Sequence, residues 1–132
     1  MIIQPRIRSN ICTNAHPIGC AAQVQTQINF VKHRDSIASP KRVLVIGASN
    51  GYGLAARIVS AFASGAATIG VGYESPAKLQ RTATAGWYNM AAFLTAAEKA
   101  GFPAFNINGD AFSAEVKDSV AEIIKEQFGN ID

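Results

Sequence analysis

Apolar residues follow two alternating patterns along this chain, and these predict strands and helices in turn. The continuous apolar run at residues 43–46 is typical of a strand buried on both faces of a parallel sheet. The next segment repeats its apolar residues at helical spacing and ends at Gly65, a residue suited to the left-handed turn that closes a helix. We expect strands over residues 42–46, 68–72 and 104–108, and helices over residues 51–64, 87–100 and 114–128.

A strand followed by a helix therefore occurs three times, and each helix is long enough to connect two parallel strands. This order predicts an α/β fold with a doubly wound parallel sheet, corresponding to the first half of a Rossmann-like fold. Residues 131–132 have the character of the start of a fourth strand. Because half of such a sheet leaves an uncovered edge, we expect the chain to be a fragment, or the ordered part, of a longer protein.

Residues 1–40 have a different pattern and are expected to form an extension of short strands and a helix. Apolar and polar residues alternate loosely over residues 2–12, which predicts one or two short strands, and Pro5 argues against a central strand. We therefore divide the chain into this extension and a sheet domain over residues 41–132.

A helix is expected to begin at Pro17, which suits a first helical turn. The spacing of Cys12, His16 and Cys20 could place three metal ligands on one helix face, but Pro17 and Gly19 interrupt a helix there and no fourth ligand is evident. We expect no metal site, buried or partly buried thiols, and a surface or capping role for His16 and also for His33. The buried stripe of the helix is expected to contain Val24, Ile28 and Val31.

A glycine-rich turn joins the apolar strand at 42–46 to the next helix. Gly47, Gly51 and Gly53 allow a backbone to approach a phosphate with no Cβ in the way, and the helix that follows offers free N–H groups and partial positive charge. Ser49 and Asn50 have short polar side chains that can reach phosphate oxygens. The turn predicts a dinucleotide pyrophosphate site with the glycine spacing of short-chain dehydrogenases, although a βα turn without a ligand has the same composition.

Acidic residues follow the next two strands. Glu74 stands where a carboxylate can bind the adenosine ribose hydroxyls and repel a 2′-phosphate, which favours NAD over NADP; the alternative is a solvated strand-end glutamate. Lys78 and Arg81 follow in a polar loop and could instead bind a 2′-phosphate. Asp110 stands where adenine is reached, or it forms a turn within residues 108–110.

Composition and charge limit the class of protein. The chain has 132 residues, of which 48% are apolar and 16% charged, as in a globular domain. It shows no apolar run of membrane-spanning length and no signal peptide, so we expect a cytoplasmic protein. The net charge of +3 is concentrated in residues 1–43, where Asp35 is the one acidic residue. Without a nucleic-acid motif, this basicity indicates a solvated face or steering of an anionic substrate rather than nucleic-acid binding.

Aromatic residues give no candidate proton donor. Trp87 and Tyr88 open a helix and are expected to anchor it in the core. None of Tyr52, Tyr73 and Tyr88 has a lysine three or four residues later, as a short-chain dehydrogenase pair requires. We therefore assign no catalytic residue.

Five segments of the chain are distinctive when taken together: residues 1–8, 11–20, 43–53, 86–89 and 107–112. They resemble the bacterial trans-2-enoyl-CoA and enoyl-acyl-carrier-protein reductase family. The resemblance covers the whole chain and is specific, because the N-terminal and Trp-Tyr-Asn strings are not general Rossmann features. It implies a larger, NADH-dependent, monomeric enzyme that reduces the 2,3 double bond of enoyl-CoA or enoyl-acyl-carrier-protein thioesters in fatty-acid synthesis.

The resemblance also implies roles for residues. It assigns the adenosine ribose to Tyr73 and Glu74, and adenine to Asp110 and Ala111. The family's catalytic Tyr-x8-Lys pair lies further downstream, so this stretch is expected to be the cofactor-binding part and inactive alone. The residues implied to bind the pyrophosphate are Gly47, Ala48, Ser49, Asn50, Gly51 and Tyr52.

Two other functions stay open from the sequence. One is a short-chain dehydrogenase that acts on a carbonyl, and the other is a non-catalytic dinucleotide-binding module complete in itself. In the favoured enoyl reductase, the basic N-terminal segment with Arg6 and Arg8 is expected to attract an acidic carrier protein or CoA.

Overall fold

A three-stranded parallel sheet forms the centre of the computed structural model, which describes residues 3–38, 40–79 and 81–132. The strand order is β3-β4-β5, with β4 in the middle, and the register pairs Arg42 with Ala67 and Thr68 with Ala104. This is the strand order of the first half of a Rossmann sheet, as predicted. The strands are β3 (Arg42–Ile46), β4 (Ala67–Gly72) and β5 (Ala104–Asn108).

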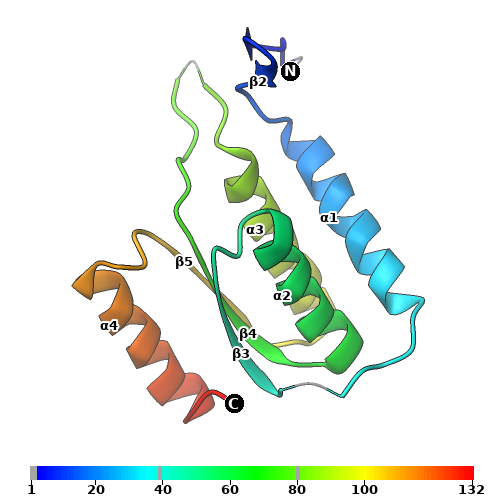
Figure 1. The fold of residues 1–132 in the computed structure, drawn as a ribbon, viewed down its shortest axis with the longest axis vertical. Coiled ribbons are helices and arrows are strands. Elements are labelled where there is room, and N and C mark those ends of the chain that lie inside the picture. Colours follow the sequence, from blue (N-terminus) through cyan, green and yellow to red (C-terminus); the bar gives the residue numbers. More distant parts are fainter. Residues whose placement is uncertain (1–2, 39, 80) are drawn as a thin grey trace.

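Helices cover both faces of this sheet, which confirms the doubly wound architecture. Helices α2 and α3 lie on one face with α1 packed across them, and α4 lies alone on the other face (Figure 1). The long helices begin and end close to the predicted residues because glycine or capping residues stand at their termini. Their bounds are α1 (Pro17–Lys32), α2 (Gly51–Ser64), α3 (Ala85–Lys99) and α4 (Ala114–Ile123).

The largest apolar core lies between α1, α2 and α3. Val24 and Ile28 of the predicted α1 stripe are each 1% exposed, and Phe62 of α2 packs edge-to-face against Phe93 with the ring centroids 6.0 Å apart. The Phe102 ring also packs edge-to-face on Phe62, with the ring centroids 5.5 Å apart. The N-terminal helix is therefore packed as a third helix onto the sheet domain.

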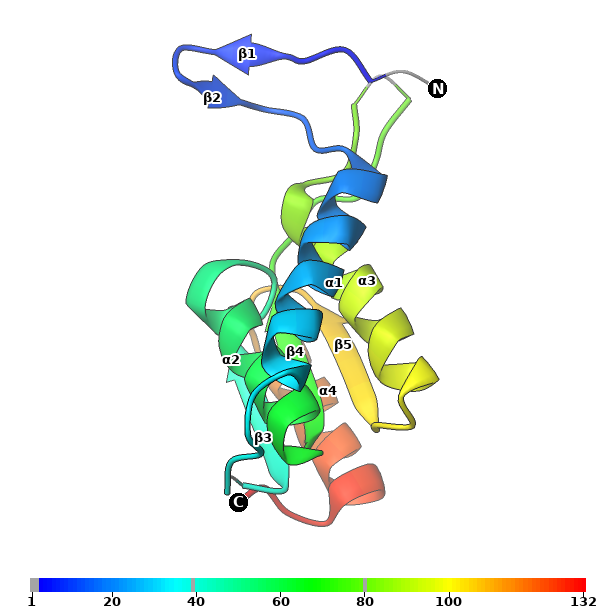
Figure 2. The same ribbon diagram turned by 90° about the vertical axis from the view of Figure 1, so that its right-hand side faces the viewer.

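A short antiparallel hairpin precedes α1 and projects away from the sheet (Figure 2). It consists of β1 (Ile7–Arg8) and β2 (Ile11–Cys12). Of the predicted strand region, Ile2 lies outside the described residues. The prediction of a buried or partly buried thiol is wrong for Cys12, which is exposed because a two-stranded hairpin buries neither face, whereas Cys20 is partly buried.

Both histidines act at helix ends. The Gly19 N–H donates a hydrogen bond to Nδ1 of His16, the residue that caps α1, and Nδ1 of His33 lies 2.6 Å from the Asn29 carbonyl oxygen. Within the described ranges, no group of histidine, cysteine and acidic residues could hold a metal ion. In the same ranges no helix has both the length and the apolar character needed to cross a membrane.

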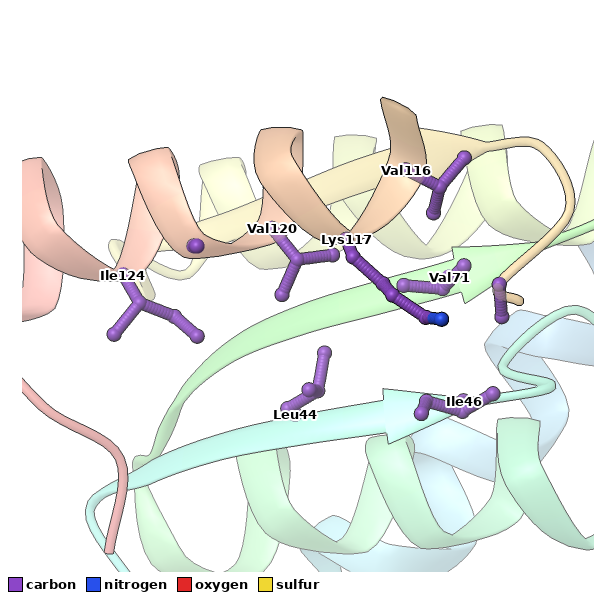
Figure 3. Close-up of a pocket in the computed structure, with 9 residues that line it drawn as sticks. Leu44, Ile46, Val71, Val116, Lys117, Val120 and Ile124 are labelled. Carbon is purple, nitrogen blue, oxygen red and sulfur yellow. The ribbon is translucent and has the colours of Figure 1, made fainter. Parts of the chain in front are cut away.

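The last helix is less buried than its apolar stripe predicts. Val116 is buried, but the other four residues of the stripe are only partly so, because α4 packs against one side of the sheet with no neighbouring helix among the described elements. A groove of about 170 Å³ lies between α4 and the strands β3 and β4, and the Lys117 side chain extends over it (Figure 3). The helix then ends in a π-helical turn, Ile124–Phe128, before Gly129. The partly buried stripe residues are Val120, Ile123, Ile124 and Phe128.

The C-terminal residues return to the open edge of β3. The Asp132 N–H donates a hydrogen bond to the Arg42 carbonyl at 3.2 Å, and the Asp132 carboxylate forms an ion pair with the Arg42 guanidinium at 2.7 Å. Residues 131–132 thus lie beside β3, where a fourth strand was expected, although they form no strand of their own within the described part of the chain.

Candidate functional site

The glycine-rich turn lies at the carboxyl end of β3 and is held by the neighbouring strand. The N–H groups of Gly47 and Ala48 both donate to the Val71 carbonyl at 2.9 Å. A Cβ on Gly53 would overlap the carbonyl oxygen of Gly47, so only glycine lets α2 begin this close to the strand. Gly47 itself has a φ of +81°. The backbone of the turn is therefore fixed by its glycines and by β4.

The first turn of α2 is open to an anion. Asn50 occupies the capping position in an extended conformation, but its side chain makes no capping hydrogen bond. No acidic residue lies in the first turn. The N–H groups and partial positive charge at this helix end are therefore left for a ligand, and a pyrophosphate matches them in charge and hydrogen bonding.

Asn89 of α3 supports the turn from beneath and received no role in the sequence analysis. Its Nδ2 donates to the Ser49 carbonyl at 3.1 Å and to Oδ1 of Asn50 at 2.8 Å, and the residue is 8% exposed. Ser49 is also 8% exposed, so little of its side chain is open to the phosphate that it was predicted to reach. It contributes to the turn through its backbone carbonyl, which accepts from Asn89. A polar residue on the buried face of a helix, next to Met90 and Phe93, was the signal in the sequence.

Glu74 is held at the end of β4 by two further residues that the sequence analysis did not single out. The side-chain amide of Asn108 pairs with the Glu74 backbone, accepting from its N–H at 2.8 Å and donating to its carbonyl at 3.0 Å. A Cβ on Gly86 would overlap the Glu74 carboxylate and would lie 2.7 Å from Nδ2 of Asn50. Gly86 therefore lets the side chains of Asn50 and Glu74 meet above the start of α3.

The remaining predicted site residues lie at the same carboxyl edge of the sheet. Tyr52 and Tyr73 are 98% and 80% exposed, which leaves both rings free to contact a ligand. Asp110 follows β5, where its Oδ1 accepts from the Phe112 N–H at 2.9 Å, so this carboxylate does form the turn considered as its alternative role. Ala111 is partly exposed beside it.

A buried arginine, Arg57, lies between the middle of α2 and the sheet. The Arg57 guanidinium donates to Oδ1 of Asn106 at 2.6 Å and to the Phe105 carbonyl at 2.7 Å, and it stacks on the Phe93 ring at 4.2 Å. Burial lowers the pKa of this guanidinium. Its hydrogen bonds to β5 fix α2, and with it the glycine turn, onto the sheet.

The anchoring prediction is wrong for Trp87. Its side chain is 38% exposed because it points from the outer side of the first turn of α3. Tyr88 is partly buried and its hydroxyl oxygen accepts from the Ala83 N–H at 3.0 Å, which fastens the loop before α3.

Comparisons with known proteins agree with this geometry. Residues 2–79 match the family model described as the NAD(P)H binding domain of trans-2-enoyl-CoA reductase, and residues 81–132 match the catalytic region of the same enzyme. The chain is 56% identical to an enoyl-[acyl-carrier-protein] reductase [NADH] of Opitutus terrae and 57% identical to the FabV enzyme of Aeromonas salmonicida. In both cases the match covers 100% of this chain and 34% of the relative, so the chain spans about a third of the length of these curated relatives.

Solved structures give the same result. The trans-2-enoyl-CoA reductase of Clostridium acetobutulicum in complex with NADH superposes with a TM-score of 0.95 at 45% identity, over 100% of this chain and 33% of that one. The Treponema denticola enzyme in complex with NAD gives a TM-score of 0.87 at 47% identity, over 97% and 34% of the two chains. With its glycine turn, its doubly wound half-sheet and a family match over residues 2–79, the chain belongs to the trans-2-enoyl-CoA reductase family.

Proposed function

We propose that this chain forms the cofactor-binding part of an NADH-dependent reductase that acts on the 2,3 double bond of enoyl thioesters. The observation that carries the proposal is the uncapped start of α2 behind a turn closed by Gly47 and Gly53, in a chain of this family. The turn would hold the pyrophosphate of NADH through backbone N–H groups from residues 47–52. Of the relatives described above, two are named for NADH and one was solved with it.

The strand ends would hold the adenosine half of the same cofactor. Glu74 follows β4, and its backbone is fixed by the Asn108 side chain. Its carboxylate would accept hydrogen bonds from the ribose hydroxyls. Tyr73 would contact the ribose as well, and Asp110 and Ala111 would contact adenine. The second oxygen of Asp110 accepts no hydrogen bond that we record within the described residues, which leaves it for a ligand.

When bound, NADH would supply a hydride for the β-carbon of the thioester. The residues of this chain would bind and orient the cofactor for that step at the edge of the sheet. A tyrosine outside this chain, aided by a lysine, would protonate or stabilise the enolate. We therefore assign no proton donor to residues 1–132.

The remaining properties of the whole protein are part of the same proposal. Its substrate would be an enoyl-CoA or an enoyl-acyl-carrier-protein, and it would act as a monomer in the cytoplasm. The absence of a membrane-crossing helix among the described residues is compatible with that location. Size-exclusion chromatography with light scattering would give the oligomeric state directly.

The proposal is tested by following NADH oxidation by the native gene product with crotonyl-CoA as substrate. Turnover with NADH and little with NADPH supports it. A protein that reduces a carbonyl substrate but not crotonyl-CoA would be another short-chain dehydrogenase. A protein that binds NADH tightly but reduces neither substrate would be a dinucleotide-binding module.

A further inference from the structure

A large basic cavity lies between the N-terminal hairpin and the loop that follows Glu74. Its volume is about 950 Å³, at the upper end of the range for small-molecule sites. The lining residues come from the hairpin segment and from the loop between β4 and α3, and Figure 2 shows that these two segments lie near one another at the same end of the molecule. The cavity is separate from the glycine turn, since none of its described lining residues belongs to residues 47–53.

Four cationic side chains line this cavity, two from each wall. Arg6 and Arg8 come from the hairpin, and Lys78 and Arg81 come from the loop about seventy residues later. None of the described lining residues is acidic, and the ion pair recorded within the described ranges does not involve these four cations. The four positive charges repel one another, and a multiply charged anion bound in the cavity would reduce this repulsion.

Backbone hydrogen bonds within each wall, and one backbone-to-side-chain hydrogen bond between them, hold the two walls in place. Lys78 and Arg81 exchange backbone hydrogen bonds at 2.9 and 3.0 Å and so form an isolated β-bridge, from which both side chains extend. The Thr13 N–H donates to the Arg6 carbonyl at 2.8 Å within the hairpin wall. The Ala15 N–H donates to Oγ1 of Thr82 at 3.1 Å, which ties the hairpin segment to the loop. The cations are thus carried by a connected framework.

We propose that this cavity binds the phosphorylated adenosine of a CoA thioester, with the four cations contacting its 3′-phosphate and pyrophosphate. The inference rests on the proposed enoyl reductase function and names the part of the substrate that is recognised. Apolar surface from Ile7, Leu79 and Tyr88 lies in the same cavity and suits an adenine ring. Phosphate oxygens accept several charge-assisted hydrogen bonds at once, which matches two arginines on facing walls.

Two other anions fit less well. The 2′-phosphate of NADPH would be attached to the ribose that Glu74 is placed to bind, and that carboxylate repels it. An acidic carrier protein would need an interface of about 800 Å² on each partner, whereas these cations surround a cavity of small-molecule size. Both anions are separate outcomes of the test.

The test uses the native gene product with Arg8→Gln and Lys78→Gln combined, which removes one cation from each wall. The matched control is Lys99→Gln with Lys125→Gln, which removes two exposed cations outside the cavity. The probe is adenosine 3′,5′-bisphosphate, titrated by calorimetry in saturating NADH so that the cofactor site is filled. We expect its Kd to rise about tenfold in the cavity variant and to stay within about twofold in the control.

Turnover gives a second readout with the same variants. The KM for crotonyl-CoA should rise about tenfold with kcat little changed, and the KM for crotonyl-pantetheine, which lacks the nucleotide, should not move. The double variant Arg6→Gln and Arg81→Gln should give the same changes as Arg8→Gln with Lys78→Gln. Agreement between the two would show that the effect does not come from misfolding of one variant.

Several results would overturn the inference. These are an unchanged Kd for the bisphosphate, a rise in KM for NADPH alone, or a rise in KM for the carrier-protein thioester alone. A wild-type protein that reduces neither thioester refutes the proposed function instead, and the calorimetric titration still decides whether the cavity binds the nucleotide.

Discussion

The side-chain amide of Asn89 joins the third helix to the glycine turn, donating to Oδ1 of Asn50 at 2.8 Å while it also donates to the Ser49 carbonyl. The bond to Oδ1 holds the Asn50 side chain away from the N–H groups at the start of α2. The helix start stays uncapped for that reason, and an uncapped start is what an anionic cofactor requires. Asn89 is thus a positioning residue for the proposed NADH site.

Replacing Asn89 by leucine keeps the branched shape of the side chain but removes its amide donor. We expect a loss of about 1–3 kcal/mol in the free energy of unfolding, because the buried Ser49 carbonyl and the partly buried Oδ1 of Asn50 lose their partner. We also expect the Kd for NADH to rise about tenfold as Asn50 is released. Thr95→Ala is the control, since Thr95 lies exposed on the same helix. A destabilised Asn89→Leu protein with wild-type NADH affinity would show that the amide is structural only.

Gly86 is expected to act on the cofactor through Glu74. Gly86→Ala places a Cβ against the Glu74 carboxylate and should weaken NADH binding severalfold by displacing it. In a Glu74→Ala background the same substitution should cost much less, because the overlapping carboxylate is gone. NADH titrations of the four proteins of this double-mutant cycle measure the coupling. Additive effects would mean that Gly86 acts through another contact, such as Asn50.

The central sheet could be predicted from the sequence almost to the residue. Strands β3 and β5 and helix α2 have the expected bounds because each is an apolar run or stripe that ends at glycine or at turn residues. The exposure of Trp87 and the half-open face of α4 could not be predicted, since periodicity shows which residues share a face but not what covers that face.

The candidate site divides in the same way. The glycine turn and Glu74 have local signatures, so the sequence alone names them as candidates. Asn89, Gly86 and Asn108 act on residues 12 to 40 positions away through single contacts. The basic cavity joins Arg8 to Lys78, residues whose proximity depends on how the hairpin and loop fold. Contacts between residues so far apart in the sequence leave no periodic pattern, so they are seen only in the three-dimensional structure.

Glu74 is predicted to select between the two nicotinamide cofactors. Glu74→Gln keeps hydrogen-bonding atoms but removes the charge that repels a 2′-phosphate. We expect kcat/KM for NADPH to rise about tenfold relative to that for NADH, measured with crotonyl-CoA. Glu98→Gln changes an exposed carboxylate on α3 and should leave the ratio unchanged. An unchanged ratio in Glu74→Gln would instead favour a solvated glutamate with no cofactor contact.

Arg57 is predicted to stabilise the fold in a way that a lysine at the same position cannot. The Arg57 guanidinium donates from three separate nitrogens, one each to the Thr68 hydroxyl, the Asn106 side chain and the Phe105 carbonyl. A lysine carries its donors on a single nitrogen, so Arg57→Lys cannot reproduce this fork and leaves acceptors unpaired. We expect a loss of about 2–3 kcal/mol in urea denaturation. Arg34 also stacks on a phenylalanine, but at the surface, and Arg34→Lys should cost less than about 0.5 kcal/mol. Equal effects of the two substitutions would argue against the fork of hydrogen bonds as the cause.

Asp132 should make stability depend on pH in acid. Its carboxylate accepts hydrogen bonds from the Lys41 N–H at 2.6 Å and from the Arg42 side chain at 2.7 Å, and these hold its pKa below the ordinary value of 3.8. Since the unfolded chain binds this proton first as the pH falls, the contribution is complete above 3.8 and is lost below it.

Denaturation of the native gene product should therefore separate wild type from Asp132→Asn near neutral pH and bring the two together in strong acid. Asp118→Asn removes an exposed carboxylate on α4 and should follow wild type throughout. A difference between wild type and Asp132→Asn that persists unchanged into strong acid could not come from the ionised carboxylate. It would have to come from uncharged contacts of residue 132, such as its backbone hydrogen bond to Arg42 of β3. The ion pair with Arg42 would then contribute nothing to holding the chain at that edge.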